Sequence, residues 1–433
     1  GGFSVTAYPP LTHQLIALLS LLLNIEVAYQ TLAVAASISL TYSVYLYSRI
    51  FLHQREAEFA ALIASLLPAT GTVLNGFGQL PTVLSTSLAL IATHKYNEYL
   101  ARGSMRSLIQ SSLLTVSSAF AHHVTFLFFV PATQMIIFIR HLRGRVSTTI
   151  LRTFIHLSIA SAITILVLWP FILFMVAPRP WVEIPHGSRQ NLFTNLQFSA
   201  MFFWGMYSFT ILLLPNAIAI ALKRKELLPP FSLFLAMLVL GLGGTTPLPS
   251  LLLGDLWQIL TYDKFAYWAT VTYTPFLAIN LVVTDVFDKK HHDGGNAPSN
   301  RKKRLILTSA FIAGLAVSYA LSSGGVVLSG MQPLQLLGDD QLDRVACFLD
   351  SNSDWRYVTL GFGNQLVPLS MKTAAQTLDG GYNLAKTYPL LVESGVENID
   401  AAKHFPNGIK LLETVLSQEA NNGLRFIVSA DEY

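Results

Sequence analysis

Long apolar runs recur along most of the chain and constrain its fold more than any other feature. A helix needs about 20 mostly apolar residues to cross the roughly 30 Å hydrocarbon core of a bilayer. The composition is 52% hydrophobic and 12% charged, whereas soluble domains carry about 25% charged residues. The sequence therefore predicts a mainly α-helical protein with a transmembrane bundle of about ten spans. We expect these spans near residues 29–50, 57–74, 79–94, 107–121, 123–139, 153–177, 199–222, 229–243, 264–284 and 304–323.

The stretch before the first span has a different character. Residues 11–24 are apolar but too short for a clear span, and Pro9 and Pro10 stand where a helix would begin. We expect residues 1–28 to form an outer-face N-terminal segment with an interfacial helix. Tyr8 and His13 are candidates for contact with a polar ligand there. The alternative is that they only accompany the start of a helix at the membrane interface, where Tyr is common.

Lysine and arginine gather in alternate connections between the expected spans. Eighteen of the 21 basic residues in 1–323 lie around 49–55, 95–106, 140–152, 223–225 and 289–304. Because basic loops stay on the cytoplasmic side, the remaining connections are expected on the extracytoplasmic side. That side would collect the opening stretch, the loops 69–81, 177–190 and 243–265, and the C-terminal region. Since the positive charge is confined to short loops, the chain is not expected to bind nucleic acid.

The last part of the chain resembles a soluble domain. Residues 324–433 carry 7 Lys and Arg against 13 Asp and Glu, while residues 1–323 carry 21 against 11. Strands are predicted at 355–363 and 423–433, and helices at 385–395 and 408–421. We therefore expect three parts: the segment 1–28, a bundle over 29–323, and an extracytoplasmic α/β domain over 324–433. Gly1 as first residue and the abrupt end at Tyr433 suggest a fragment, with that domain truncated.

Two adjacent histidines, His122 and His123, interrupt an apolar stretch where two spans are expected to meet at the outer face. An ionisable residue at membrane depth usually faces the bundle interior or a water-filled cavity. The pair could contact phosphate or a metal, or could only bond backbone carbonyls at a helix end. No carboxylate or third histidine lies at helical spacing, so this motif alone builds no metal site.

The loop 177–190 contains Arg179, Glu183 and Arg189. Arginine binds phosphate or carboxylate bidentately, and Glu183 could act as a base or as an ion ligand. An ordinary solvated loop is the alternative.

Asp263 and Lys264 stand at the outer mouth of an aromatic-rich span, in the stretch TYDKFAYWATV. Lys264 is the only basic residue in its outer connection. It could pair with Asp263 or with an anionic ligand, or it could extend its amine to the interface as lysines near helix ends often do.

The order of several short motifs resembles a known group of membrane proteins. YPPLTH, AHH between two spans, and GLGGTTPLPSLL followed by LTYDKFAYWA resemble integral membrane glycosyltransferases of the GT-C type. The C-terminal stretches WRYVTLGFGNQ, LDGGYNLAKTYPLLVESGVENID and GLRFIVSADEY are similar to the membrane proteins labelled "6-pyruvoyl-tetrahydropterin synthase-related". We do not expect pterin chemistry, because Cys347 is the only cysteine and the histidines are dispersed.

The GT-C resemblance implies transfer of a sugar from a polyprenyl-phosphate donor at the extracytoplasmic face of the cell membrane. It places a catalytic carboxylate in an outer loop before the Pro-Pro stretch, and this chain has no Asp or Glu there. Asp263 and Glu183 are the substitute candidates for catalysis. Tyr8, His13, His122, His123, Arg179, Arg189 and Lys264 are the candidates for substrate binding.

Partners and cofactors follow from the same resemblance. Membrane lipids and the donor lipid are the expected partners; the cofactor is undetermined, with a divalent cation as one option, and no metal ligands are assigned. Two other functions stay open. The chain could be a non-catalytic membrane protein that presents an extracytoplasmic binding domain, or a transporter or flippase, although the span interiors contain almost no ionisable residues.

Overall fold

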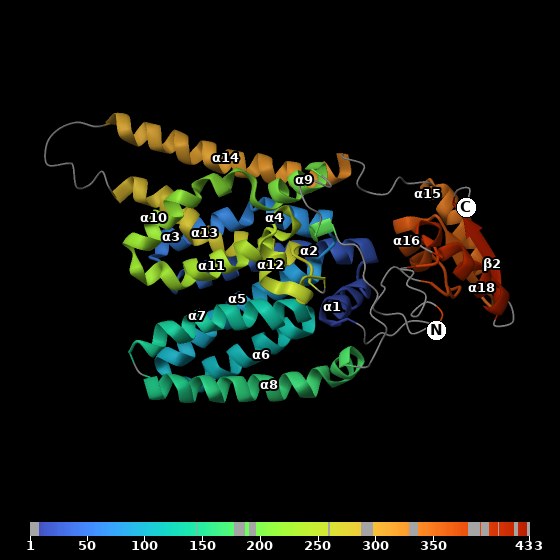
Figure 1. The fold of residues 1–433 in the computed structure, drawn as a ribbon, viewed down its shortest axis with the longest axis horizontal. Coiled ribbons are helices and arrows are strands. Elements are labelled where there is room, and N and C mark those ends of the chain that lie inside the picture. Colours follow the sequence, from blue (N-terminus) through green and yellow to red (C-terminus); the bar gives the residue numbers. More distant parts are fainter. Residues whose placement is uncertain are drawn as a thin grey trace. The chain divides into compact units, whose positions relative to one another are not determined.

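The structure is a computed structural model and describes residues 8–144, 146–176, 187–189, 196–258, 260–286, 298–328, 337–379, 390, 398–405, 407–419 and 423–430. The chain divides into two compact units. The first comprises residues 1–8, 170–185 and 327–433, and the second comprises 9–169 and 186–326. Figure 1 shows the helices of the second unit and the smaller group of strands and helices near the C-terminus.

The second unit is a bundle of α-helices. Its helices are α1 (Leu11–Ser20), α2 (Ile25–Ser48), α3 (Gln54–Ser65), α4 (Pro68–Gly71), α5 (Leu80–Arg102), α6 (Met105–Ala121), α7 (Val130–Leu142), α8 (Val146–Val176), α9 (Leu196–Tyr207), α10 (Leu214–Lys223), α11 (Leu228–Gly241), α12 (Leu248–Leu253), α13 (Asp263–Val286) and α14 (Pro298–Leu328). Two π-helical turns, η1 (Thr72–Gly76) and η2 (Thr125–Phe129), precede α5 and α7. Turns of this kind are rare in proteins, and those that occur are often found at functional sites.

Among the residues that the structure describes, six helical segments are long and apolar enough to cross a membrane: Ile25–Ser48, Gln54–Gly76, Thr125–Leu142, Val146–Leu173, Phe202–Lys223 and Leu305–Gly324. They overlap six of the expected spans. The other four expected spans coincide with α5, α6, α11 and α13, so the total of ten remains a prediction. The short run expected at 11–24 forms α1, which begins directly after Pro10.

Helix α13 lies at the centre of the bundle and packs against α3, α9 and α11. Nearly every residue from Tyr262 to Ile279 is buried. Because this helix does not face lipid, it tolerates threonines, and the hydroxyls of Thr270 and Thr272 donate to carbonyls one turn earlier. At Gly241 any side chain would meet the Ala266 backbone at 2.5 Å, so glycine permits the close approach of α11 to α13.

Helices α5 and α6 pack closely through small polar residues. Ser85 contacts Ser118 at 2.8 Å, and the Ser111 hydroxyl donates to the Ala92 carbonyl at 3.0 Å. Small residues and interhelical hydrogen bonds are the usual means of helix association in a bilayer, where burial of apolar surface contributes little. This explains why α5 and α6 are less hydrophobic than the six candidate spans and yet form part of the bundle.

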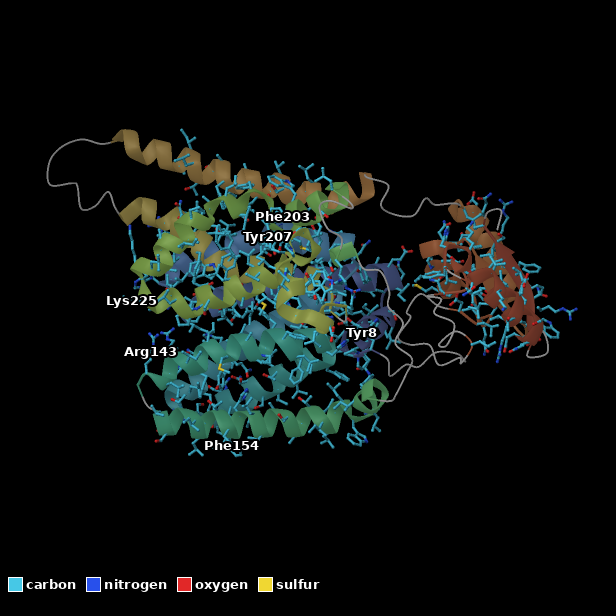
Figure 2. The ribbon with its side chains drawn as sticks, in the orientation of Figure 1. Tyr8, Arg143, Phe154, Phe203, Tyr207 and Lys225 are labelled. Carbon is cyan, nitrogen blue, oxygen red and sulfur yellow. The ribbon has the colours of Figure 1, made fainter. Side chains whose placement is uncertain are left out.

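The basic connections meet at one end of the helices. Arg140 donates to the Ile50 carbonyl, and Arg152 donates to the Leu100 carbonyl at 2.6 Å. Arg224 forms an ion pair with the buried Glu56 at 2.8 Å. Figure 2 labels Arg143 and Lys225 at this same end. The gathering of positive charge expected from the sequence is therefore present in the three-dimensional arrangement.

The first unit, which we call the C-terminal unit, contains two parallel strands among its described residues. They are β1 (Arg356–Leu360) and β2 (Leu424–Ser429), as the sequence predicted within 355–363 and 423–433. Helices α15 (Asp339–Asp350), α16 (Leu366–Lys372) and α18 (Gly408–Glu419) accompany them. Helix α18 matches the helix predicted at 408–421, whereas the predicted helix at 385–395 lies almost wholly outside the described residues. Two small hydrophobic clusters, around Leu349 and Val358, give this unit cores of its own.

Candidate functional site

Asp263 is the first residue of α13 and only 1% exposed. Its Oδ2 accepts a hydrogen bond from Nε2 of Gln79 at 2.5 Å and lies 3.3 Å from Nζ of Lys264. A buried carboxylate is costly unless it is paired and hydrogen-bonded. The amide and the ammonium group meet that requirement at Oδ2, and the positive end of the α13 dipole adds to it. The aspartate is therefore held as an oriented anion.

Lys264 is itself mostly buried, at 8% exposure. Its Nζ donates to Oγ1 of Thr261 at 2.7 Å and approaches Asp263 as its second partner. An ammonium group has three donors, and the structure describes partners for two of them. The sequence left open whether Lys264 pairs with Asp263, extends to the interface or binds a ligand. The structure shows the pairing with Asp263. The burial of the Lys264 side chain differs from the exposure expected of a lysine that extends to the interface.

His122 and His123 form the connection between α6 and η2, outside the six candidate spans. Their rings lie 5.6 Å apart between centroids. Nδ1 of His122 lies 2.8 Å from Oγ1 of Thr125 and accepts from the Thr125 backbone N–H at 3.3 Å. Because Nδ1 is an acceptor, a neutral His122 ring carries its proton on Nε2. The pair thus links the end of α6 to η2, and the Thr125 contacts fix the orientation of the His122 ring.

The two histidines are close enough to Lys264 for its charge to act on both imidazoles. Burial is the main cause that lowers the pKa of His122, and the charges of Lys264 and His123 lower it further. Burial, followed by the Lys264 charge, lowers the pKa of His123 to about 4. Both rings are therefore neutral near pH 7, so this cluster has ionic groups at Asp263 and Lys264 and neutral donors and acceptors at the histidines.

A short 3-10 turn, η3 (Gly187–Arg189), packs against α9 and against the turn Gly243–Thr245, and it bonds to residues just before α13. Oγ of Ser188 accepts from the Tyr262 backbone N–H at 2.9 Å, and Nε of Arg189 donates to the Leu260 carbonyl at 3.2 Å. At Gly243 the φ angle is +54°, and a Cβ atom there would lie 2.4 Å from the Ser188 carbonyl oxygen. Only glycine therefore allows this close approach. Arg189 is thereby bonded to Leu260, which stands three residues before Asp263 in the chain.

An aromatic layer supports the start of α13. Phe128 and Phe129, at the end of η2, contact Phe265 and Trp268 at centroid distances of 5.4 and 5.3 Å. Nε1 of Trp268 donates to Oγ1 of Thr86 on α5 at 3.0 Å. On α9, the rings of Phe203 and Tyr207, labelled in Figure 2, lie 5.1 Å apart between centroids with their planes tilted. These contacts hold α5, η2 and α13 in the register that brings Gln79, His122 and Asp263 together.

This group, which we name the outer cluster because the sequence predicts it on the outer side, comprises Gln79, His122, His123, Arg189, Asp263 and Lys264. It lies at the end of the helices opposite to the basic connections. Helix α5 begins next to Gln79 and ends at Arg102, which its 23 residues place about 34 Å away. Helix α6 runs from the basic end to His122, and α13 starts at Asp263. The separation of polar cluster and basic connections is therefore a property of the fold.

The structure brings together five of the residues predicted from the sequence: His122, His123, Arg189, Asp263 and Lys264. Arg179 and Glu183 lie outside the described residues, so their roles stay predictions. Tyr8 is part of the C-terminal unit, and His13 is an exposed residue of α1. The participation of these two residues also stays a prediction.

Gln79 was missed by the sequence analysis, although it contacts the buried aspartate directly. It stands in the connection 69–81, which the sequence predicts on the outer side, directly before Leu80 and Pro81 at the start of α5. Its polarity at that position is the only sequence signal. Thr125 and Ser188 were missed as well, because short hydroxyl side chains are common at helix starts and turns.

The described residues contain no group of three or more His, Cys, Asp or Glu side chains that could hold a metal ion. Within those residues, the outer cluster supplies one carboxylate and two imidazoles, and the cationic Lys264 lies among them. A divalent cation does not fit this arrangement of Asp263, His122, His123 and Lys264.

Fold and site together define a helical membrane protein with several candidate spans and a buried polar cluster at one end of its helices. Residues 5–323 match the family model of the 6-pyruvoyl-tetrahydropterin synthase related domain, described as a membrane protein. The chain belongs to this family, which confirms the family expected from its motifs. No curated protein matches the chain.

The solved structures that are similar to the chain include two of an archaeal oligosaccharyltransferase. One is the oligosaccharyltransferase of Archaeoglobus fulgidus in the apo form, with a TM-score of 0.49 and 13% identity over 98% of this chain and 62% of that protein. The other is the archaeal oligosaccharyltransferase AglB from Archaeoglobus fulgidus in complex with an inhibitory peptide and a dolichol-phosphate. Its TM-score is 0.47 at 13% identity, over 98% of this chain and 61% of that protein. The chain thus spans about three fifths of the length of these chains.

Proposed function

We propose that this protein is a membrane glycosyltransferase of the GT-C type, which transfers a sugar from a polyprenyl-phosphate donor to an acceptor hydroxyl. The reaction takes place at the extracytoplasmic ends of the helices, where the outer cluster lies. The observation that carries the proposal is the buried Asp263 carboxylate, held by Gln79 and Lys264 beside two buried imidazoles, at the end of the bundle away from the basic connections.

The proposed reaction needs a base. The acceptor oxygen attacks the anomeric carbon of the donor sugar, and the bond from that carbon to the phosphate oxygen breaks. The bonding electrons leave with the lipid phosphate, and the proton of the acceptor hydroxyl passes to the base. Asp263 is the only carboxylate of the outer cluster among the described residues and is proposed for this role. Glu183, in the loop before Arg189, is the second candidate.

The leaving phosphate needs positive charge and hydrogen-bond donors. Lys264 forms an ion pair with the Asp263 carboxylate, and Arg189 donates a hydrogen bond to the carbonyl of Leu260 in the same segment. His122 presents an Nε2–H donor when neutral. Fixed cations and donors of this kind stabilise charge that develops on a leaving group. Arg179, Tyr8 and His13 are proposed as further substrate contacts, and the proposal assigns no step to a metal ion.

The test is transfer activity of the full-length natural protein in proteoliposomes, supplied with radiolabelled polyprenyl-phosphate sugars and membrane acceptors. Asp263→Asn keeps the shape of the side chain and removes the base, and we expect a loss of transfer of about 10²- to 10⁴-fold. Asp255→Asn is the matched control, because Asp255 is an exposed aspartate in the same outer connection. That variant is expected to keep the wild-type rate.

Two outcomes would contradict the proposal. If Asp263→Asn transferred sugar at the wild-type rate, Asp263 would not be the base, although the proposed function would still hold. Absence of transfer from every polyprenyl-phosphate sugar by a folded wild-type protein would overturn the function itself. That result would favour the alternative of a non-catalytic membrane protein that presents its C-terminal unit for binding. If the protein instead moved the donor lipid across the bilayer without transferring its sugar, the result would favour a flippase.

A further inference from the structure

A groove runs between α7, α10 and α11 on the side of the bundle. Its volume is about 470 Å³, within the 300–1,000 Å³ typical of ligand pockets. Its walls are apolar side chains from the three helices, namely Ile136, Ile139, Ile218, Leu222, Leu228 and Leu235. Ser232 also lines it, but its hydroxyl donates to the Pro229 carbonyl of its own helix at 2.8 Å. The groove therefore offers an occupant almost no polar partner along its length.

One charged side chain, Arg143, lines the groove at its end. Arg143 directly follows α7 and is exposed. In the part of the chain that the structure describes, no carboxylate forms an ion pair with it. The groove-lining residues Leu222 and Leu228 flank the connection Lys223-Arg224-Lys225-Glu226-Leu227, which has a net charge of +2. Positive charge is thus concentrated at one end of an otherwise apolar groove.

The groove lies where lipid meets the protein. Helix α7 belongs to the candidate span Thr125–Leu142, and α10 belongs to Phe202–Lys223. From Arg143, the groove follows α7 back to Ile136, a helical distance of about 10 Å toward the middle of the span. Ile139 and Ile218 are 41% and 40% exposed, so their side chains must be covered by hydrocarbon in a bilayer.

From this arrangement we infer that the groove binds one anionic glycerophospholipid of the membrane leaflet at the basic end. An acyl chain lies along α7, α10 and α11, and the phosphate lies against the Arg143 guanidinium. Charge complementarity is the argument, because basic pockets between transmembrane helices favour anionic head groups and guanidinium binds phosphate bidentately. The site is separate from the outer cluster, and it does not depend on the proposed transfer reaction.

The test compares lipid binding to the purified full-length chain by native mass spectrometry. The probes are phosphatidylglycerol and phosphatidylcholine with identical acyl chains, and polyprenyl phosphate is a third probe. We expect phosphatidylglycerol to bind more tightly than phosphatidylcholine. Arg143→Gln is expected to weaken phosphatidylglycerol about fivefold, a typical contribution of one basic residue near an anionic surface, and to leave phosphatidylcholine unchanged.

Two further variants separate the groove from general surface charge. Ile139→Trp fills the groove at an exposed position and is expected to weaken both phospholipids. Arg106→Gln removes an exposed arginine at the same end of the bundle but away from the groove, and it is expected to change neither. The inference is overturned if phosphatidylglycerol shows no preference, if Arg106→Gln matches Arg143→Gln, or if Ile139→Trp has no effect. Displacement of phosphatidylglycerol by equimolar polyprenyl phosphate would overturn the proposed occupant.

Discussion

Gln79 and Asp263 are 184 residues apart in the sequence, and their side chains meet through a hydrogen bond from Nε2 to Oδ2. The bond joins the start of α5 to the start of α13, so one contact links a peripheral connection to the central helix. Both ends are fixed: Gln79 follows the π-helical turn η1, and Asp263 opens a helix that is buried as far as Ile279.

Replacing Gln79 tests this bond. In Gln79→Leu the buried carboxylate loses its amide donor, and we expect a loss of about 1–3 kcal/mol in the free energy of unfolding. Gln258→Leu makes the same change at an exposed position of the outer connection and should be close to neutral. The measurement is reversible unfolding in mixed micelles. Equal stabilities for the two variants would show that the bond contributes nothing.

The low pKa of His123 predicts a pH dependence of stability. Burial lowers this pKa to about 4, below the ordinary value of 6.5 in an unfolded chain. Between these values the unfolded chain binds a proton that the folded chain does not bind, so stability is complete above pH 6.5 and falls as the pH decreases to about 4. Unfolding measured from pH 7.5 to 4 should show this decrease.

The variant His123→Gln has no titrating ring at this position, and it should flatten part of that dependence. His13→Gln, at an exposed position on α1, serves as the control and should keep the wild-type slope. If both variants have the same slope as the wild type, His123 is not the group that titrates.

At the opposite end, Glu56 is 7% exposed and pairs with Arg224, which also contacts the exposed Glu226. Arg224→Met leaves the buried Glu56 without its cation. Breaking a buried pair costs about 3–5 kcal/mol, and the partial exposure of Arg224 reduces the expected loss to about 1–2 kcal/mol. Glu226→Gln, which removes the exposed partner, should cost less than about 0.5 kcal/mol. A larger loss for Glu226→Gln than for Arg224→Met in micelle unfolding would contradict this account.

In the C-terminal unit, the Asp400 carboxylate accepts from the backbone N–H groups of Phe362 and Gly363 at 2.9 and 2.7 Å. These bonds fix the loop that follows β1. We expect Asp400→Ala to increase amide hydrogen exchange in β1 and this loop, with a local cost of about 1–3 kcal/mol. Asp340→Ala, at an exposed position, should leave exchange unchanged, and unchanged exchange in Asp400→Ala as well would contradict the role of Asp400.

Hydrophobicity predicted most of the helix positions, because lipid-facing segments must be apolar throughout. The sequence also predicted that His122, His123, Asp263 and Lys264 share one face, since their placement follows from the alternation of basic connections. It did not predict Gln79, because a single polar residue before a helix has no periodic signal. The π-helical turns η1 and η2 were missed for a similar reason, as a five-residue change in helical pitch leaves no mark in composition.

The sidedness of the outer cluster is the central claim, and cysteine labelling in intact cells tests it most directly. After Cys347→Ser removes the only native cysteine, single cysteines are placed at Asp255, in the outer connection, and at Gly144, in a basic connection. A membrane-impermeant maleimide should label position 255 in intact cells and position 144 only after permeabilisation. Labelling of both positions in intact cells, or of position 144 alone, would contradict the account.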